Sequence, residues 1–218
     1  MDTATPKPNM WERDAITARS FQVIEEELQG ESLDPVVFPI VRRVIHATAD
    51  FDFVRLLRFH PRAIQAGVEF LRAGGTIITD VRMVEVGIHH GLVRAVGGRT
   101  LCLVHDAEVA QIAAAAGETR SAVAIRKAAE VCQGRGLFVI GNAPTALFAL
   151  LRLVEERQAV PALIVGVPVG FVGAVEAKEA LMARENIPWI VSQGRKGGSA
   201  VAVAIMNALL LLAVGQNG

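Results

Sequence analysis

The chain has 218 residues, and 52% of them are hydrophobic, which is enough to bury a large core and more than a disordered protein contains. Its 22 Lys and Arg residues balance its 22 Asp and Glu residues, so the charge gives no indication of binding to nucleic acid. The length fits one domain over residues 1–218, of which residues 1–10 are expected to be flexible.

Neither the composition nor the N-terminus indicates a membrane protein. The most apolar stretch, residues 201–214, contains Asn207 and falls short of the roughly 20 apolar residues that a membrane-spanning helix needs. The N-terminus is polar and lacks the apolar centre of a signal peptide. Cys102 and Cys132 lie in apolar segments, as free thiols in a reducing compartment do. We therefore expect a soluble, cytoplasmic protein without disulfides.

Helical periodicity dominates the first third of the chain. It predicts helices over residues 11–28, 34–49 and 61–73, and Asp34-Pro35 is a typical helix start. From Gly74 onward, short apolar runs alternate with helical segments. The expected strands are residues 76–79, 100–104, 137–140, 163–167 and 189–192. The expected helices among and after them are residues 83–89, 107–116, 121–132, 145–156, 174–184 and 199–212.

The expected strands are rich in Val and Ile and carry almost no charge, which is typical of strands covered on both faces. Strands and helices that alternate at this spacing favour right-handed crossovers and parallel pairing. The sequence therefore predicts an α/β protein: a three-layer α/β/α sandwich with a mainly parallel, five-stranded sheet and extra N-terminal helices.

Glycine-rich junctions follow several of these strands, at the sheet edge where such proteins bind ligands. They are residues 140–145, 166–173 and 194–199, and a further helix start at residues 117–121 carries Arg120. Any single glycine could simply complete a tight turn. Taken together, with Arg120 and Arg195 beside helix starts, they favour a ligand with several negative groups. Their spacing matches neither G-x-G-x-x-G nor G-x-x-x-x-G-K-[ST], so nucleotide binding is only weakly supported.

Arginine predominates among the basic residues, because only Lys7, Lys127, Lys178 and Lys196 are lysines. The planar guanidinium suits carboxylate ligands, although codon bias in a GC-rich genome explains the excess of arginine equally well.

The chain has five histidines, and histidine is the side chain best suited to proton transfer near neutral pH. His46 lies late in the second expected helix, a position at which a buried structural histidine is commoner than a catalytic one. His105 follows an expected strand and could face the ligand edge. His89 and His90 are adjacent, so on a helix they point in different directions. No C-x-x-C or H-E-x-x-H spacing occurs, and no protein-bound metal is expected.

Seven short motifs follow one another along nearly the whole chain. They are Arg19-Ser20-Phe21, Arg43-Val44-Ile45-His46-Ala47, and residues 79–84 (TDVRMV), 117–122 (GETRSA), 140–147 (IGNAPTAL), 166–174 (GVPVGFVGA) and 194–200 (GRKGGSA). In this order they resemble the motifs of the precorrin-8X methylmutases and their cobalt-precorrin-8 counterparts. The glycine-rich motifs are weak singly, but the set is highly specific.

The resemblance implies an isomerase that moves a methyl group between adjacent carbons of ring C of a tetrapyrrole, forming the corrin chromophore of cobalamin. It also implies a homodimer with the active site near the subunit interface, and no separate organic cofactor. The catalytic histidine of the family maps onto His46, which would donate and recover a proton. Ser20 maps onto a substrate-contacting hydroxyl, and Thr17 lies one helical turn before it.

The matched motifs also provide candidate contacts to the carboxylates of the substrate. These are Arg120, Ser121, Arg195 and the backbone of Gly197 and Gly198. A cobalt ion, if present, would belong to the substrate, and no residue decides whether it is there.

Two alternatives to an isomerase remain: a non-catalytic tetrapyrrole carrier, and a nucleotide-dependent α/β enzyme. Two motif residues also have structural interpretations. Asp80 could simply cap the helix that follows it. Phe171 could line the pocket, but an ordinary core position is its more frequent role.

Overall fold

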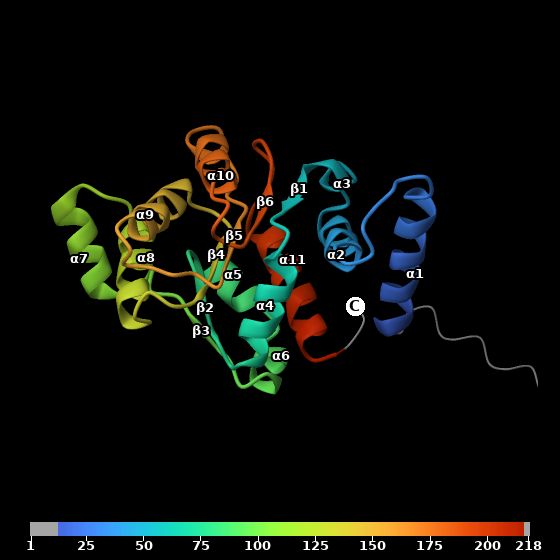
Figure 1. Ribbon diagram of the computed structural model, residues 1–218, viewed down its shortest axis with the longest axis horizontal. Helices are drawn as coiled ribbons and strands as arrows, with labels where there is room; N and C mark the ends of the chain where they lie inside the picture. The colour runs from blue at the N-terminus through green and yellow to red at the C-terminus, as the bar shows by residue number, and fades with distance from the viewer. Residues whose placement is uncertain (1–12, 216–218) are drawn as a thin grey trace, which may run out of the picture.

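The computed structural model describes residues 13–215, so the expectation for residues 1–10 lies outside the described residues. Its centre is a six-stranded sheet with the order β1-β6-β5-β4-β2-β3 (Figure 1). The strands are β1 (Leu57–Phe59), β2 (Thr76–Thr79), β3 (Arg99–Leu101), β4 (Leu137–Ile140), β5 (Leu163–Gly166) and β6 (Trp189–Ser192). Five of them are parallel, and β1 pairs antiparallel with β6.

Helices cover both faces of this sheet. One layer contains α2 (Phe38–Thr48), α4 (Ala63–Arg72), α5 (Arg82–Gly87), α6 (His90–Ala95) and α11 (Ser199–Ala213). The other contains α8 (Arg120–Val131), α9 (Pro144–Glu155) and α10 (Ala174–Met182). Three helices lie outside these layers: α7 (Ala107–Ala116) against α8, α1 (Arg13–Glu27) against α2, and α3 (Phe53–Leu56) between α2 and β1. The predicted three-layer α/β/α sandwich is confirmed.

The core explains why the apolar runs form the central strands. All four side chains of β4 are buried, because helices pack on both of its faces. The last helix, α11, is buried along most of its length among α2, α4 and α5. The apolar stretch at residues 201–214 is thus a core helix, and no helix within residues 13–215 is long and apolar enough to cross a membrane.

The predicted strand number was wrong by one. Strand β1 has only three residues, and its central Arg58 is exposed at the sheet edge, so its sequence lacks the apolar run of a covered strand. The second helix also begins later than residue 34. The Asp34 carboxylate accepts a hydrogen bond from the Val36 amide at 2.8 Å and forms a turn, and α2 begins at Phe38.

The antiparallel β1 brings the end of α2 to the carboxyl edge of the sheet. Leu57 at the start of β1 pairs with Ser192 at the end of β6. Helices α2 and α3 lead into β1, so the segment after His46 lies beside the loop after Ser192. Two motifs about 150 residues apart in the chain therefore meet at one edge.

Candidate functional site

His46 and Ser20 line one cavity of about 300 Å³ between α1 and α2. His46 lies in the last turn of α2 with an exposed side chain, and Ser20 lies in the middle of α1. Arg19, Val23, Ile24, Glu27, Ile45, Ala49 and Phe51 complete the lining. The cavity therefore combines an apolar wall with an imidazole, a hydroxyl, the Glu27 carboxylate and the Arg19 guanidinium, which pairs with Glu26 at 3.6 Å.

The imidazole of His46 is oriented by an aromatic contact. The Phe21 ring meets it edge to face, with 5.2 Å between ring centroids and an interplanar angle of 79°. The Arg42 guanidinium lies 4.2 Å from the Phe21 centroid on the same helix as His46. Among the described residues, the ring nitrogens of His46 have no hydrogen-bond partner. Both nitrogens can therefore meet a ligand.

Ser20 is held in place by its own helix. Its hydroxyl donates to the Ile16 carbonyl at 2.9 Å, which leaves the oxygen lone pairs to accept a hydrogen bond in the cavity. Thr17 is half-buried one turn earlier on α1, and it is not among the residues that line this cavity.

Arg43 and Arg19 are cationic neighbours of His46 that were not among the site residues predicted from the sequence. Arg43 is half-buried, and its Nε atom is buried without a hydrogen-bond partner among the described residues. Burial lowers the pKa of Arg43, and the nearby charge of Arg42 lowers it further. Arg19 belongs to the same family motif as Ser20, and Arg43 belongs to the same motif as His46. Membership in these motifs could have identified both arginines from the sequence.

The loop of residues 193–198 provides a second group of candidate residues. Arg195 is exposed, and its guanidinium lies 5.4 Å from the centroid of the Phe171 ring. The Gly198 amide donates to the Val167 carbonyl at 2.8 Å, so it is already used inside the protein. The Gly197 amide donates to no backbone carbonyl among the described residues. Phe171 is 86% exposed, so its interpretation as a core residue was wrong.

Arg120 and Ser121 lie at the far end of the sheet, in the first turn of α8. The Thr119 hydroxyl caps this helix by accepting from the Ala122 amide at 3.3 Å, and it also bonds to the Thr145 hydroxyl at 2.7 Å. Helix α8 covers the opposite face of the sheet from α2, and the two lie toward opposite ends of the long axis (Figure 1). One chain thus does not bring Arg120 into the cavity of His46.

Asp80 has a structural role other than capping the helix after it. Its side chain is fully buried and accepts hydrogen bonds from the amides of Gly141, Asn142 and Ala143 at 3.0, 2.9 and 2.8 Å. Burial raises the pKa of the Asp80 carboxyl, and the three amides oppose that rise. The N-cap of α5 is Val81, which has no side-chain cap. Asp80 therefore fixes the turn between β4 and α9, a contact between separate parts of the chain.

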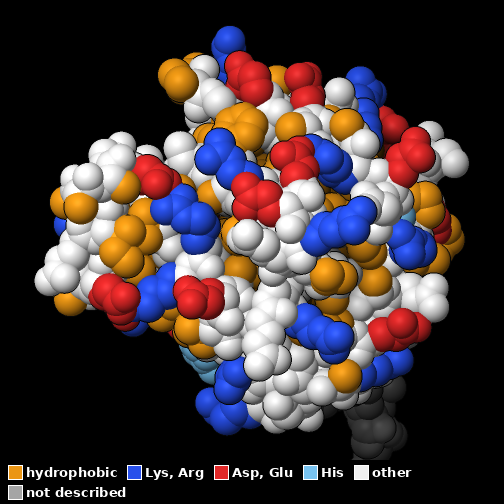
Figure 2. All heavy atoms as spheres, turned by 60° about the vertical axis from the view of Figure 1, so that its left-hand side comes forward, with side chains coloured by type: hydrophobic (Ala, Val, Ile, Leu, Met, Phe, Trp, Pro, Cys, Tyr) orange, Lys and Arg blue, Asp and Glu red, His pale blue; other side chains and the backbone are white. Residues whose placement is uncertain are grey.

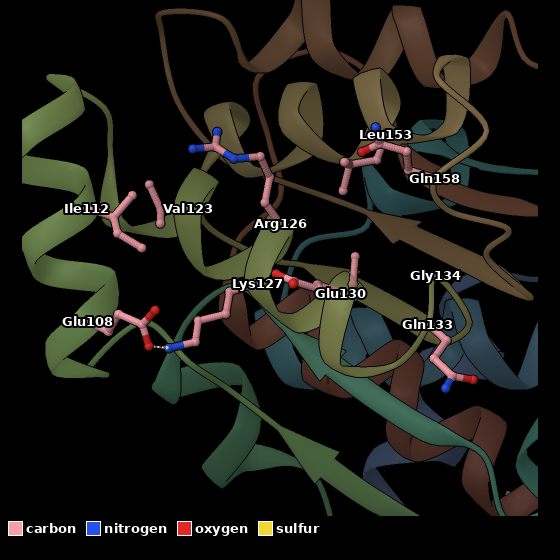
Figure 3. Close-up of a pocket in the computed structure, with 11 residues that line it drawn as sticks. Glu108, Ile112, Val123, Arg126, Lys127, Glu130, Gln133, Gly134, Leu153 and Gln158 are labelled. Carbon is pink, nitrogen blue, oxygen red and sulfur yellow. Dashed lines mark hydrogen bonds and ion pairs between the residues drawn. The ribbon is translucent and has the colours of Figure 1, made fainter.

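A larger groove, of about 460 Å³, lies between α7 and α8 and is shown in Figure 3. Its cations are paired: Lys127 contacts Glu108 and Asp106, and Arg126 contacts Glu118. Figure 2 shows positive and negative side chains interspersed on this end of the molecule. The groove contains no histidine, so it offers neither free positive charge nor a proton donor suited to neutral pH.

Within residues 13–215, no three His, Cys, Asp or Glu side chains are grouped so that they could hold one metal ion. The two cysteines, Cys102 and Cys132, are free thiols.

The sequence pattern of precorrin-8X methylmutases matches residues 15–212. The chain belongs to the precorrin-8X methylmutase family. A cobalt-precorrin-8 methylmutase of Priestia megaterium is 44% identical over 95% of this chain and 91% of its own length. A precorrin-8X methylmutase of Pseudomonas aeruginosa is 43% identical over 89% of this chain and 93% of its own. The crystal structure of a precorrin-8X methylmutase from Thermus thermophilus superposes with a TM-score of 0.83, at 39% identity, over 94% of this chain and all of the other.

Membership in the precorrin-8X methylmutase family makes this chain an isomerase of cobalamin biosynthesis. The resemblance found in the seven motifs is thereby confirmed, because the match covers both helical layers and the sheet between them.

Proposed function

We propose that this protein catalyses the methyl shift on ring C of precorrin-8X or of cobalt-precorrin-8, with His46 as the proton donor and acceptor. The observation that carries the proposal is the shared cavity of His46 and Ser20, in which the imidazole nitrogens have no partner among the described residues. A histidine changes its protonation state near neutral pH, so it can give a proton to a ligand and take it back.

The methyl shift needs one acid, and no proton is gained or lost over the whole reaction. Protonation of the conjugated macrocycle by His46 makes it electron-poor, which assists migration of the methyl group with its bonding electrons to the adjacent carbon. The same proton then returns to the His46 imidazole, so substrate and product are isomers. The Phe21 contact supports this role, because it limits the directions in which the imidazole can point.

Arginine side chains and backbone amides hold the carboxylates of the substrate in this proposal. Arg19 lines the cavity of His46, and Arg43 lies about one helical turn before His46 on α2, with its guanidinium 5.5 Å from the Phe21 centroid. Arg195 and the Gly197 amide stand on the adjacent loop. Ser20 of α1 contacts the macrocycle from the other side of the cavity, and Thr17, which is outside the lining, makes its contact where the substrate extends beyond the cavity along α1. A guanidinium is suited to a carboxylate because it donates two parallel hydrogen bonds.

We propose further that the active unit is a homodimer in which Arg120 and Ser121 reach the cavity of a second copy. Two features support this arrangement. Arg120 and His46 lie on opposite faces of the sheet within one chain. The carboxyl edge between them carries Phe171 and Val172, which are 86% and 89% exposed, more than apolar side chains usually are on a surface that meets only water.

The experiment compares wild type with His46→Asn on both substrates, because relatives named for each are 44% and 43% identical to this chain. Turnover is followed by absorbance, and binding of the product hydrogenobyrinic acid is measured separately. We expect the His46→Asn variant to lose turnover by about 100- to 10,000-fold, the usual contribution of a general acid, and to keep product binding.

His105→Asn is the matched control, because His105 is exposed and lies outside the cavity. It should keep full turnover. Full turnover in His46→Asn would disprove the role of His46. Product binding without turnover of either substrate by wild type would favour a carrier.

A further inference from the structure

Lys196 links the loop after β6 to the segment that follows His46. Its Nζ atom donates to Oδ2 of Asp50 and to Oδ2 of Asp52, both at 2.6 Å. Asp50 and Asp52 lie four and six residues after His46, in the turn between α2 and α3. The hydrogen bond from Lys196 lowers the pKa of Asp50, so this carboxylate is ionised at neutral pH. The ammonium thus closes a bridge between two loops.

The turn that Lys196 holds begins immediately after the helix of His46. Helix α2 ends at Thr48, and Ala49 has a left-handed backbone conformation with φ of 51°. Because Ala49 also lines the cavity, a movement of the Asp50 segment would change the cavity wall one turn from His46. The position of this segment therefore bears on the position of the imidazole.

The backbone of Lys196 is anchored in the interior. Its carbonyl accepts hydrogen bonds from Lys178 Nζ at 3.0 Å and from Ser192 Oγ at 2.8 Å, and both donor residues are fully buried. Burial lowers the pKa of Lys178 to about 8. A buried lysine is costly to the fold, so its presence here points to a specific use of its hydrogen bond.

The rest of this loop is seated too tightly to shift. Gly197 has φ of 156°, and a Cβ atom there would lie only 2.3 Å from the Val167 carbonyl oxygen. The Gly198 amide donates to that carbonyl, and the Gly170 amide donates to the Arg195 carbonyl at 3.2 Å. The loop after β6 is thus fixed to the loop after β5, and Lys196 projects from a rigid base.

We infer that Lys196 is a positioning residue for His46: its ammonium clamps the Asp50–Asp52 turn, while Lys178 and Ser192 hold its backbone. The inference rests on the proposed role of His46. The clamp contributes little to stability, since solvent screens an exposed ion pair. Its effect is on geometry, because a general acid must lie within hydrogen-bond reach of the atom that it protonates.

The first test is a set of four proteins: Lys196→Met, the double variant Asp50→Asn with Asp52→Asn, the triple variant, and Lys196→Arg. We expect the methionine and double variants to lower kcat by a similar factor of about 10 to 100, with KM changed less than threefold. The triple variant should be no worse than either, because the three groups act as one unit. Lys196→Arg keeps the charge and should recover most of kcat.

Lys127→Met is the matched control. Lys127 also contacts two carboxylates, those of Asp106 and Glu108, but at the α7 end of the molecule. It should keep kcat within about twofold, which would show that loss of such a cluster alone does not lower turnover. Binding of hydrogenobyrinic acid should be unchanged in every variant, since the clamp does not contact the ligand.

Three outcomes would overturn the inference. Lys196→Met could keep kcat, or it could raise only KM while the double variant stays normal, which would make Lys196 a substrate contact. The losses could also multiply in the triple variant. If His46→Asn is inactive and Lys196→Met is normal, the proposed function stands and only the clamp is wrong. Full activity of His46→Asn would instead remove the proposed function itself.

Discussion

The two ends of the sheet differ in whether the polar side chains of their cavities already have partners within the protein. At the β1 end, the cavity of His46 is about 300 Å³, and the Nε atom of Arg43 is buried without a partner among the described residues. At the α7 end, the groove is larger, about 460 Å³, but Lys127 and Arg126 are paired with carboxylates. Arg19 in the cavity of His46 pairs with Glu26 at 3.6 Å, so the difference lies in the His46 imidazole and the Nε atom of Arg43. These unpartnered groups indicate the site better than volume does, because a paired cation has less to offer a ligand.

If the two ends of the sheet meet through a second copy, two inactive variants should complement each other in a mixed dimer. His46→Asn and Arg120→Ala chains, with different affinity tags, are produced together and separately. Each variant alone should have little activity at low substrate concentration. The mixed population should recover about a quarter of wild-type activity, because half of its dimers are mixed and each mixed dimer has one intact site. Purification through both tags checks that mixed dimers have formed.

Absence of recovery in confirmed mixed dimers would show that Arg120 does not serve the cavity of the partner. Arg126→Ala provides the control for the second chain. Arg126 lies on the same helix, but its guanidinium is already bound to Glu118, so this variant should be active by itself.

Lys178 and Lys127, at the two ends of the sheet, should change the pH dependence of stability in opposite directions. Burial lowers the pKa of Lys178 to about 8, so between pH 8 and 10.5 the folded protein binds fewer protons than the unfolded chain. Stability of wild type relative to Lys178→Met should therefore rise with pH across this window, by up to about 3 kcal/mol. Urea unfolding at several pH values measures this difference.

Lys127 at the other end should show the opposite sign. The Glu108 and Asp106 carboxylates raise its pKa, so its contribution is present below the unfolded pKa of 10.5 and is lost as the pH rises through the higher folded value. Burial also raises the pKa of Cys102 and Cys132, but all variants share these thiols and their effect cancels. If the stability difference between wild type and each variant changed equally with pH for Lys178→Met and Lys127→Met, the lowered pKa of Lys178 would be contradicted.

The same contrast shows which features could be read from the sequence. Strands such as β4 were predictable, because residues buried on both faces leave an uninterrupted apolar run. Strand β1 was not, because its identity depends on pairing with the distant β6. His46 was found through the family motif, while its spacing alone favoured a structural histidine. That it shares a cavity with Ser20 depends on how α1 packs against α2.

The features that the sequence did not predict depend on contacts between residues far apart in the chain. Lys178 stands in Glu176-Ala177-Lys178-Glu179, a pattern typical of a solvated helix face, and its burial results from the loop that folds over α10. The carboxylate of Asp80 binds amides about 60 residues away, so no local capping rule could identify them. Local chemistry thus predicts which elements form, and the tertiary contacts decide what their polar groups bind.

The groove between α7 and α8 should tolerate a bulky side chain that the cavity of His46 does not. Ile112 is 40% exposed on the wall of the groove between α7 and α8, where Figure 3 shows it close to Val123. Ile112→Trp should fill part of this groove and leave kcat/KM within about twofold of wild type, since a surface substitution away from a site changes little. Val23→Trp, the corresponding change in the cavity of His46, should lower kcat/KM because it occupies the space of the macrocycle. Thermal unfolding confirms that both variants are folded. If Ile112→Trp alone lowered turnover, the larger groove would belong to the substrate path. The His46 imidazole and the unpartnered Nε atom of Arg43 would then no longer identify the site.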